Sequence, residues 1–436
     1  MTEEEKKQGN EADKGQKKRV QGTDEGESLL KKKFSRRDML KLSALTGAGI
    51  AVATSGVAST LDLIQHFSQE STEEKENNQI ISMFGKHQPG IITEQQTYCY
   101  LVAFELLTDD KAELVSLLQD WTLFALKATK GIQVKDSSND LLPPNDTGDS
   151  IGLGAQKLTL TIGYGATLFE KNGVDRFGIK NRKPLFLKDI PKFAHDSLED
   201  DYSDGDILFQ SCSNDRQVAF HAIRNLIRIG SGKVQVKFLE DGFIKGAKKE
   251  TPRNLFGFKD GTCNADHDSQ KGYKEVVWAE NDEPTWFQGG SYLGYRKIQM
   301  FLEVWDRSSL YDQENTFGRN KMSGAAFGRK KEFDEVILSK QPKDSHVYLA
   351  KKTEQQIHRR AYSYQNGIQS KTGNIDAGLL FISFMKDPFK QYVPMLKIMG
   401  EKDALNEYTK PIGNGLYACQ KGLSKGEYFG QQLFQA

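Results

Sequence analysis

Two segments in the second half of the chain hold the residues best suited to chemistry. In residues 257–261 (GFKDG), two glycines bracket Asp260 and would let the backbone approach a flat ligand closely. His346 lies in an Asp-Ser-His-Val stretch, and His358-Arg359-Arg360 follows it closely. Asp-Gly is also a common turn, and a lone histidine is usually structural. Neither segment identifies an activity by itself.

Several other catalytic and metal-binding patterns do not occur in the sequence. The seven histidines form no HxxxH or HExxH pair, which disfavours a histidine-based zinc hydrolase. The lack of GxSxG and GxGxxG argues against an α/β-hydrolase and a dinucleotide enzyme. Four widely spaced cysteines form no CxxC pair and give no support for a zinc ribbon or a disulfide scaffold. With 60 basic and 59 acidic residues, no charge excess points to nucleic acid.

The elements that must position these residues follow one scheme twice. Each half shows strand-like runs, and helical patterns follow the aspartates at 109–110, 215, 306 and 387. Strands are predicted over residues 98–107, 157–165, 206–212, 298–305 and 378–385. The repeated order of strand, short loop, helix and strand predicts two related α+β units with antiparallel sheets, of the split βαβ type.

The first eighty residues differ in composition from the rest. Residues 1–33 are rich in Glu, Lys, Gln and Gly and are expected to be disordered. Arg36-Arg37 ahead of the weakly apolar residues 42–58 resembles a twin-arginine export signal, and such systems carry folded cargo. Gly56-Val57-Ala58 is compatible with signal-peptidase cleavage. An uncleaved membrane anchor is the alternative, although the apolar stretch is short for a bilayer of about 30 Å.

Taken together, the motifs resemble the dye-decolourising peroxidase family over roughly residues 86–435. The resemblance rests on GFKDG, on DSHV and on RRAYSY at residues 359–364, in that order. The nearest branch is the exported deferrochelatase/peroxidase group of bacterial iron-uptake operons. Further agreeing segments are residues 90–93, 163–165, 289–293, 305–306, 313–314 and 317–321.

The family resemblance implies a fold and a cofactor. Two ferredoxin-like domains are expected, and one haem b per chain would bind in the C-terminal domain. The expected division is a disordered region with the signal peptide (1–58), a linker (59–83), an N-terminal domain (84–245) and a C-terminal domain (246–436).

The resemblance also implies roles for the central site residues. His346 matches the proximal ligand of haem iron, and Asp260 matches the distal acid that moves a proton during O–O cleavage. Arg359 matches the distal arginine, with Arg360 as the runner-up. Glu407 is the predicted carboxylate partner of the proximal histidine, whereas Glu401 and Asp403 are the surface-charge alternative.

The remaining site residues would contact the cofactor itself. Gly261, Thr262 and Cys263 would line the haem face. Lys351, Lys352 and Thr353 would meet the haem edge, although a solvated charge run is the competing interpretation. Arg319 would either touch a propionate or form a structural ion pair.

The implied function is a haem peroxidase that uses hydrogen peroxide to oxidise small reductants such as phenols or dyes. The branch also implies release of iron from haem with the porphyrin ring left intact. The alternative is a non-catalytic haem-delivery protein, but haem binding alone needs neither Asp260 nor Arg359. Expected partners are the twin-arginine translocase, a membrane iron permease and an iron-binding lipoprotein, with no nucleic acid and with homo-oligomerisation left open. The expected location is the periplasm or the outer face of the cell membrane.

Overall fold

The computed structural model describes residues 78–435, with the exception of 135–138, 140 and 248–249. The predicted disordered segment, the twin-arginine signal and most of the predicted linker lie outside the described residues. Across the described ranges, none of the helices combines the length and the apolar character that a membrane crossing requires. The expected domain boundary near residue 245 stays a prediction.

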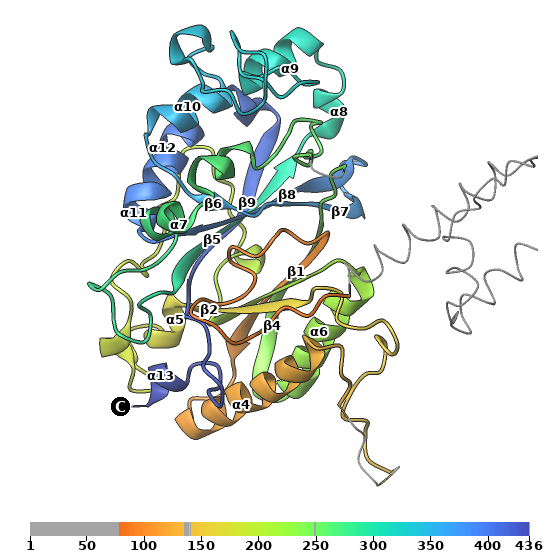
Figure 1. Ribbon diagram of the computed structural model, residues 1–436, viewed down its shortest axis with the longest axis vertical. Coiled ribbons are helices and arrows are strands. Elements are labelled where there is room, and N and C mark those ends of the chain that lie inside the picture. Colours follow the sequence, from red (N-terminus) through yellow and green to blue (C-terminus); the bar gives the residue numbers. More distant parts are fainter. Residues whose placement is uncertain (1–77, 135–138, 140, 248–249, 436) are drawn as a thin grey trace, which may run out of the picture. The chain divides into compact units, whose positions relative to one another are not determined.

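The first half is a four-stranded antiparallel sheet covered by two helices. Its strands lie in the order β2-β3-β1-β4. Helix α4 joins β1 to β2 and helix α6 joins β3 to β4, which is the split βαβ order. The two helices pack against each other (Figure 1). The elements are β1 (Tyr98–Leu106), α4 (Lys111–Ala128), β2 (Thr159–Gly165), β3 (Ile207–Ser213), α6 (Arg216–Ile229) and β4 (Val234–Phe243).

The helix starts follow from the aspartates that the sequence places there. Asp110 accepts a hydrogen bond from the backbone N–H of Ala112 at 2.7 Å, and Asp215 accepts one from Val218 at 2.9 Å. Each carboxylate satisfies an N–H group that has no partner within its helix. The predicted helix starts after these aspartates are therefore confirmed.

The second half repeats the scheme with longer insertions. Its strands lie in the order β7-β8-β5-β9, and the short β6 also pairs with β8. The strands are β5 (Ser291–Met300), β6 (His358–Arg359), β7 (Tyr362–Ile368), β8 (Ile375–Met385) and β9 (Thr409–Cys419). The helices between them are α8 (Leu302–Trp305), α9 (Leu310–Phe317), α10 (His346–Lys352), α11 (Pro388–Gln391) and α12 (Val393–Lys402). Both halves thus have the ferredoxin-like order, as predicted.

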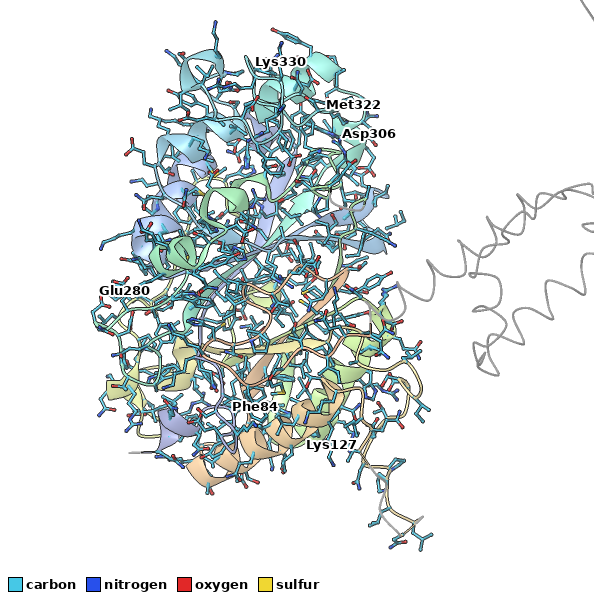
Figure 2. All side chains as sticks on the ribbon, viewed as in Figure 1. Phe84, Lys127, Glu280, Asp306, Met322 and Lys330 are labelled. Carbon is cyan, nitrogen blue, oxygen red and sulfur yellow. The ribbon has the colours of Figure 1, made fainter. Side chains whose placement is uncertain are left out.

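Short helices complete the described chain. They are α5 (Ala166–Phe169), α7 (Gln270–Val276), α13 (Gln431–Phe434) and the 3-10 turns Lys180–Arg182, Asp200–Tyr202, Thr262–His267, Leu338–Lys340 and Ala404–Glu407. Figure 2 labels Asp306, Met322 and Lys330 in the insertion between β5 and β6. This insertion carries α8, α9 and α10.

The two sheets close into one barrel through two short seams. At the first seam Tyr164 and Gly165 of β2 pair with Ala418 and Tyr417 of β9. At the second, Phe243 of β4 pairs with Ser363 of β7, and the pairing of β5 with β8 closes the ring. The barrel is therefore built from two half-barrels that share few backbone pairs.

Apolar side chains from both half-barrels fill the barrel interior. Phe238 of β4 stacks on Tyr295 of β5 with ring centroids 5.3 Å apart. One ion pair also crosses the interior, because Lys297 Nζ of β5 lies 2.7 Å from Glu240 Oε1 of β4. Both charged side chains are 3% exposed, so each depends on the other for compensation of its buried charge.

The predicted strand over residues 298–305 is only partly correct. The strand covers Ser291–Met300, and Leu302–Trp305 forms a helical turn. A short apolar run fits a strand and a buried helix equally well, so sequence periodicity cannot separate them. The turn places Trp305 against Phe256, whose carbonyl accepts a hydrogen bond from the indole N–H at 3.1 Å.

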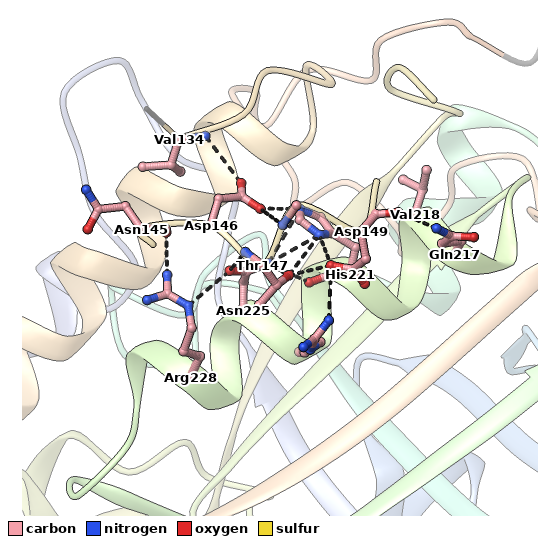
Figure 3. A network of polar contacts seen from close by, with 12 residues as sticks. Val134, Asn145, Asp146, Thr147, Asp149, Gln217, Val218, His221, Asn225 and Arg228 are labelled. Carbon is pink, nitrogen blue, oxygen red and sulfur yellow. Dashed lines mark hydrogen bonds and ion pairs between the residues drawn. The ribbon is translucent and has the colours of Figure 1, made fainter. Parts of the chain in front are cut away.

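A buried histidine fastens the loop before β2 to helix α6 (Figure 3). His221 Nδ1 lies 2.8 Å from Asp149 Oδ1, and Nε2 lies 3.5 Å from Asp146 Oδ1. Asn225 Nδ2 donates to Thr147 Oγ1 at 2.8 Å in the same network. In the part of the chain that the structure describes, no group of three or more His, Cys, Asp or Glu side chains is arranged to hold a metal ion. The hydrogen bonds of this network connect residues 146–149 to helix α6.

Candidate active site

A cavity in the C-terminal half has a volume of about 240 Å³. Strands β5 and β8, helices α10 and α12, and residues 254–263 contribute its walls. Its apolar lining includes Phe256, Phe258, Phe317, Leu379, Phe381 and Leu396. Polar and charged side chains also contribute to the lining, but most of the surface that faces the cavity is apolar. A mostly apolar surface with polar groups at defined positions is typical of a cofactor site.

The first polar pair in the cavity joins His346 to Asp403. His346 is the first residue of α10, and Asp403 follows the last residue of α12. His346 Nδ1 lies 2.7 Å from Asp403 Oδ2, and Asp403 Oδ1 accepts the N–H of Leu405 at 2.9 Å. A carboxylate accepts hydrogen bonds, so Nδ1 carries the proton, and in the neutral imidazole Nε2 then holds the lone pair. The arrangement leaves Nε2 as a ligand atom for the cavity.

The prediction that Glu407 is the partner of His346 is wrong. Glu407 ends the 3-10 turn Ala404–Glu407, and its side chain is exposed. Asp403 instead caps that turn, which buries its carboxylate and aims one oxygen at the imidazole. The sequence contains a signal for this role, because an aspartate just after a helical pattern often caps the next turn.

The second polar pair in the cavity joins Asp260 to Arg359. Arg359 Nη2 donates to Asp260 Oδ1 at 2.7 Å. Asp260 Oδ2 has a longer contact of 3.4 Å with Asn254 Nδ2. The carboxylate is 5% exposed and the guanidinium 19%. The structure thus brings together the two residues that the sequence pattern separated by about a hundred positions.

Backbone contacts fix the position of Arg359. Asn264 Nδ2 donates to the Arg359 carbonyl at 2.7 Å, and the Arg359 N–H donates to Asn264 Oδ1 at 3.0 Å. Arg360 turns to the opposite face, because successive side chains of an extended chain alternate. Its guanidinium donates to the carbonyl of Thr93 and to Gln96 in the barrel interior. Of these two neighbouring arginines, Arg359 is therefore the one that lines the cavity.

The residues after Asp260 shape one wall of the cavity. Gly261 has φ +103°, and a Cβ atom added there would meet no protein atom within 4 Å. Its neighbour Thr262 donates its hydroxyl to Glu332 Oε1 at 2.9 Å. Cys263 also lines the cavity, and burial raises the pKa of its thiol. A flat ligand could therefore lie against Gly261 without steric conflict.

Only one residue of the predicted basic edge lines the cavity. Lys351 does so, and it forms an ion pair with Asp266. Lys352 extends over the ring of Tyr348, with Nζ 5.8 Å from the ring centroid, and the Thr353 hydroxyl donates to the Ala350 carbonyl. The helix explains the difference, because His346 and Ala350 share the cavity face at a spacing of four residues. That spacing turns Lys352 and Thr353 away.

Arg319 lines the cavity and is also held by backbone. Its Nη1 donates to the carbonyls of Gly324 at 2.6 Å and Glu332 at 3.0 Å. Burial lowers its pKa. The contacts favour a structural role and leave the propionate role as a prediction.

Sequence reasoning missed three polar residues near the cavity. Asp403 and Asn264 hold the two functional pairs in place, as described above. Arg296 of β5 also lines the cavity and forms a buried ion pair with Asp196. No local pattern marks Arg296, because a charged residue within a strand normally faces solvent.

Comparisons with known proteins place both halves of the chain in one family. Residues 88–244 match the model of the N-terminal part of Dyp-type peroxidases, and residues 251–424 match that of the C-terminal part. The deferrochelatase of Escherichia coli strain K12 is 36% identical over 422 residues, which cover 92% of this chain and 97% of the relative.

Solved structures of DtpA and DypB are similar to this chain. Ferric DtpA from Streptomyces lividans superposes with a TM-score of 0.76 at 31% identity, covering 83% of this chain and 99% of that one. A DypB variant from Rhodococcus jostii in complex with heme shares the fold, with a TM-score of 0.58 at 19% identity over 76% of this chain and 96% of that one. With the family models spanning both halves and the site residues in one cavity, this chain belongs to the Dyp-type peroxidase family.

Proposed function

We propose that this chain is a haem-dependent peroxidase that takes hydrogen peroxide as its oxidant and that also removes iron from haem without opening the porphyrin ring. The observation that carries the proposal is the presence of two polar pairs, His346–Asp403 and Asp260–Arg359, in one apolar cavity. The first pair offers a ligand atom and the second offers proton transfer beside a fixed positive charge.

Haem b fits the chemistry of the cavity walls. The apolar lining suits a porphyrin, and Gly261 leaves room for a flat ring. His346 would bind the iron through Nε2, since Nδ1 is committed to Asp403. Arg296 and Lys351 also line the cavity and would supply positive charge for the propionates. When bound there, haem would supply the iron that binds peroxide and the electrons that reduce it.

Asp260 is placed to move a proton between the two oxygens of hydrogen peroxide. Its Oδ1 is held by Arg359 and its Oδ2 has the longer contact with Asn254, so Oδ2 is the oxygen that would accept a proton from one peroxide oxygen and donate it to the other. The oxygen that receives this proton leaves as water. No other carboxylate in the lining is hydrogen-bonded to a cavity arginine and adjacent to a glycine with open space above it.

Arg359 stabilises the negative charge that develops as the O–O bond breaks. Its Nε is buried and has no hydrogen-bond partner within the described residues, so one donor remains available in the cavity. Asn264 fixes the backbone from which the side chain extends. The donor is therefore positioned before peroxide arrives.

Asp403 controls the basicity of His346. A carboxylate that accepts the Nδ1 proton increases electron density at Nε2 and holds the ring orientation. Because Leu405 N–H fixes the other carboxylate oxygen, Asp403 cannot turn away. Asp403 is thus a positioning residue for the iron ligand.

Iron release is the second part of the proposal, and the identity to a deferrochelatase over 92% of the chain supports it. A haem-delivery protein without turnover is not favoured, because such a protein has no need of the Asp260–Arg359 pair. Small phenols or dyes are the proposed reducing substrates of the peroxidase reaction.

Replacing Asp260 with Asn tests the peroxidase proposal. The amide cannot accept the proton, so kcat/KM for peroxide-dependent dye oxidation should fall by about 10²–10⁴-fold. Asp268→Asn is the matched control, because Asp268 is exposed and outside the cavity lining, and its activity should equal that of the wild type. Unchanged dye oxidation in Asp260→Asn would contradict the mechanism.

Substituting Asp403 and Glu407 separately tests the corrected assignment. Asp403→Asn should weaken haem binding by about 10–100-fold, since the ligand loses its proton acceptor. Glu407→Gln should leave the affinity unchanged, because that side chain is exposed. Titration of the haem-free proteins with haem, followed by the Soret band, measures both. The reverse order of affinities would return the role to Glu407.

The iron-release activity predicts a product that can be seen directly. Incubating the purified protein with haem, under reducing and under oxidising conditions, should produce the fluorescence of free protoporphyrin. The His346→Ala protein, which lacks the iron ligand, should produce none. Absence of fluorescence from the wild type in both conditions would remove this part of the proposal.

Export is proposed from the N-terminal sequence. Arg36-Arg37 ahead of the weakly apolar residues 42–58 supports transport by a twin-arginine translocase to the outer side of the membrane, where a membrane iron permease and an iron-binding lipoprotein would be the partners. Arg36→Lys/Arg37→Lys should leave the full-length precursor in the cytoplasmic fraction. Lys17→Arg/Lys18→Arg, a paired basic change outside the motif, should be exported normally. Normal export of the first variant would contradict the proposal.

A further inference from the structure

Two cysteines face each other across neighbouring strands of the barrel. Cys99 of β1 is paired in register with Cys212 of β3, and both side chains are fully buried. Each thiol also shifts the pKa of the other, because burial and Cys212 raise the pKa of Cys99 and Cys99 lowers the pKa of Cys212. Directly opposed residues in antiparallel strands have Cα atoms about 4.5–5.5 Å apart, within the range that a disulfide spans. The pair can therefore close an S–S bond without a change of register.

The surroundings of Cys212 favour its reactive form. Burial alone would raise the pKa of the Cys212 thiol, yet the hydrogen bond with Cys99 and the charge of Arg360 lower it to about 7. The Tyr362 hydroxyl also donates to Cys212 Sγ at 3.5 Å. Arg360 Nε is buried and has no hydrogen-bond acceptor in the described part of the chain, and the positive charge of this guanidinium is one cause of the lowered pKa of Cys212.

The other two cysteines lack this arrangement. Cys419 lies in the same apolar cluster, but burial raises the pKa of its thiol and no second thiol pairs with it. Cys263 lines the active-site cavity alone. Cys99 and Cys212 are therefore a distinct dithiol site.

A single layer of backbone separates this dithiol from the active-site cavity. On the connected pair Arg359-Arg360, the first side chain lines the cavity and the second reaches Cys212. On β8, Phe381 lines the cavity, whereas its neighbour Leu380 faces the barrel interior and pairs in register with Tyr362. Peroxide has no open path to thiols that are fully buried. Electrons, in contrast, can cross one packed layer through Tyr362.

We propose that Cys99 and Cys212 are an internal two-electron reductant of the active site, which acts through Tyr362 when no external substrate is present. The proposal rests on the proposed peroxidase function, which supplies hydrogen peroxide as the oxidant. Two S–H bonds break and one S–S bond forms across β1 and β3. The two electrons and two protons that the thiols release reduce one hydrogen peroxide, whose O–O bond breaks, to two waters. The dithiol thereby consumes oxidising equivalents that would otherwise damage the protein.

The test uses the haem-loaded protein and an equimolar amount of hydrogen peroxide without dye. After the reaction the protein is denatured in N-ethylmaleimide, digested without reductant and analysed by mass spectrometry. The expected result is a linked peptide that joins Cys99 to Cys212, while Cys419 carries the alkyl label. The same peroxide added to haem-free protein should leave both thiols alkylated.

Three variants test whether the linked peptide depends on Cys212 and on Tyr362. Cys212→Ser should lose the linked peptide, and the matched buried control Cys419→Ser should form it as the wild type does. Tyr362→Phe should lose the linked peptide at the reaction time at which the wild type forms it. All three variants should oxidise dye as the wild type does, because none of these side chains lines the cavity. Excess dye added to the wild type should also suppress the linked peptide.

The possible failures are distinguishable. If the loaded protein oxidises dye while Cys99 and Cys212 stay alkylated, the dithiol proposal is overturned and the peroxidase function stands. A linked peptide that forms equally in haem-free protein, or oxidation confined to Cys263, would also overturn it. Loss of both dye oxidation and the linked peptide would overturn the proposed function and this inference with it.

Discussion

The sheet of the C-terminal half is buried on both faces, and the rest of the structure depends on this burial. Strand β8 carries the near-continuous apolar run GLLFISFM, which is the pattern of a strand that is covered on both sides. Leu380 and Ile382 face the barrel interior, whereas Leu379 and Phe381 face the cavity. Removing this apolar surface from water is favourable on both sides. The N-terminal sheet covers the face toward the barrel interior. The face toward the cavity requires a large, flat, apolar ligand to cover it.

The functional polar groups enter this apolar environment as paired sets. His346 has Asp403, and Asp260 has Arg359. Lys297 has Glu240 in the barrel interior. A buried charge without a partner is costly, so each set fixes the geometry of its members as well as compensating their charge. The same extended chain serves two chemistries, because Arg359 belongs to the cavity and Arg360 to the dithiol site.

The sequence was sufficient to predict the structural elements that depend on local residue patterns. Strands and helices followed from apolar periodicity and from capping aspartates such as Asp110 and Asp215, and the repeated order predicted two similar units. Family resemblance brought His346, Asp260 and Arg359 together. Three features were not predicted, because they depend on three-dimensional packing. The apolar run ending at Trp305 turned into a helix where the indole could pack on Phe256.

The carboxylate partner of His346 escaped for a related reason. Asp403 and Glu407 lie within one turn of each other, and both could reach the imidazole by sequence position alone. Only the burial of the cap residue selects Asp403. The closure of the two sheets through a few pairs at each seam was equally hidden, because strand pairs far apart in the sequence leave no local signature.

The outer faces of the two sheets are covered differently. In the N-terminal half, α4 packs its buried Trp121 and Phe124 into the core beneath the sheet, and Trp121 meets Phe209 of β3 with ring centroids 5.1 Å apart. In the C-terminal half, α10 and α12 leave a cavity of about 240 Å³ between themselves and the strands. A bound cofactor there takes the place of core side chains, so its binding free energy adds to the folding free energy of that half. If the chain is exported in the folded state, the C-terminal half must already be stable in the cytoplasm. Because the cofactor contributes to that stability, export of folded chains would select those that have bound it.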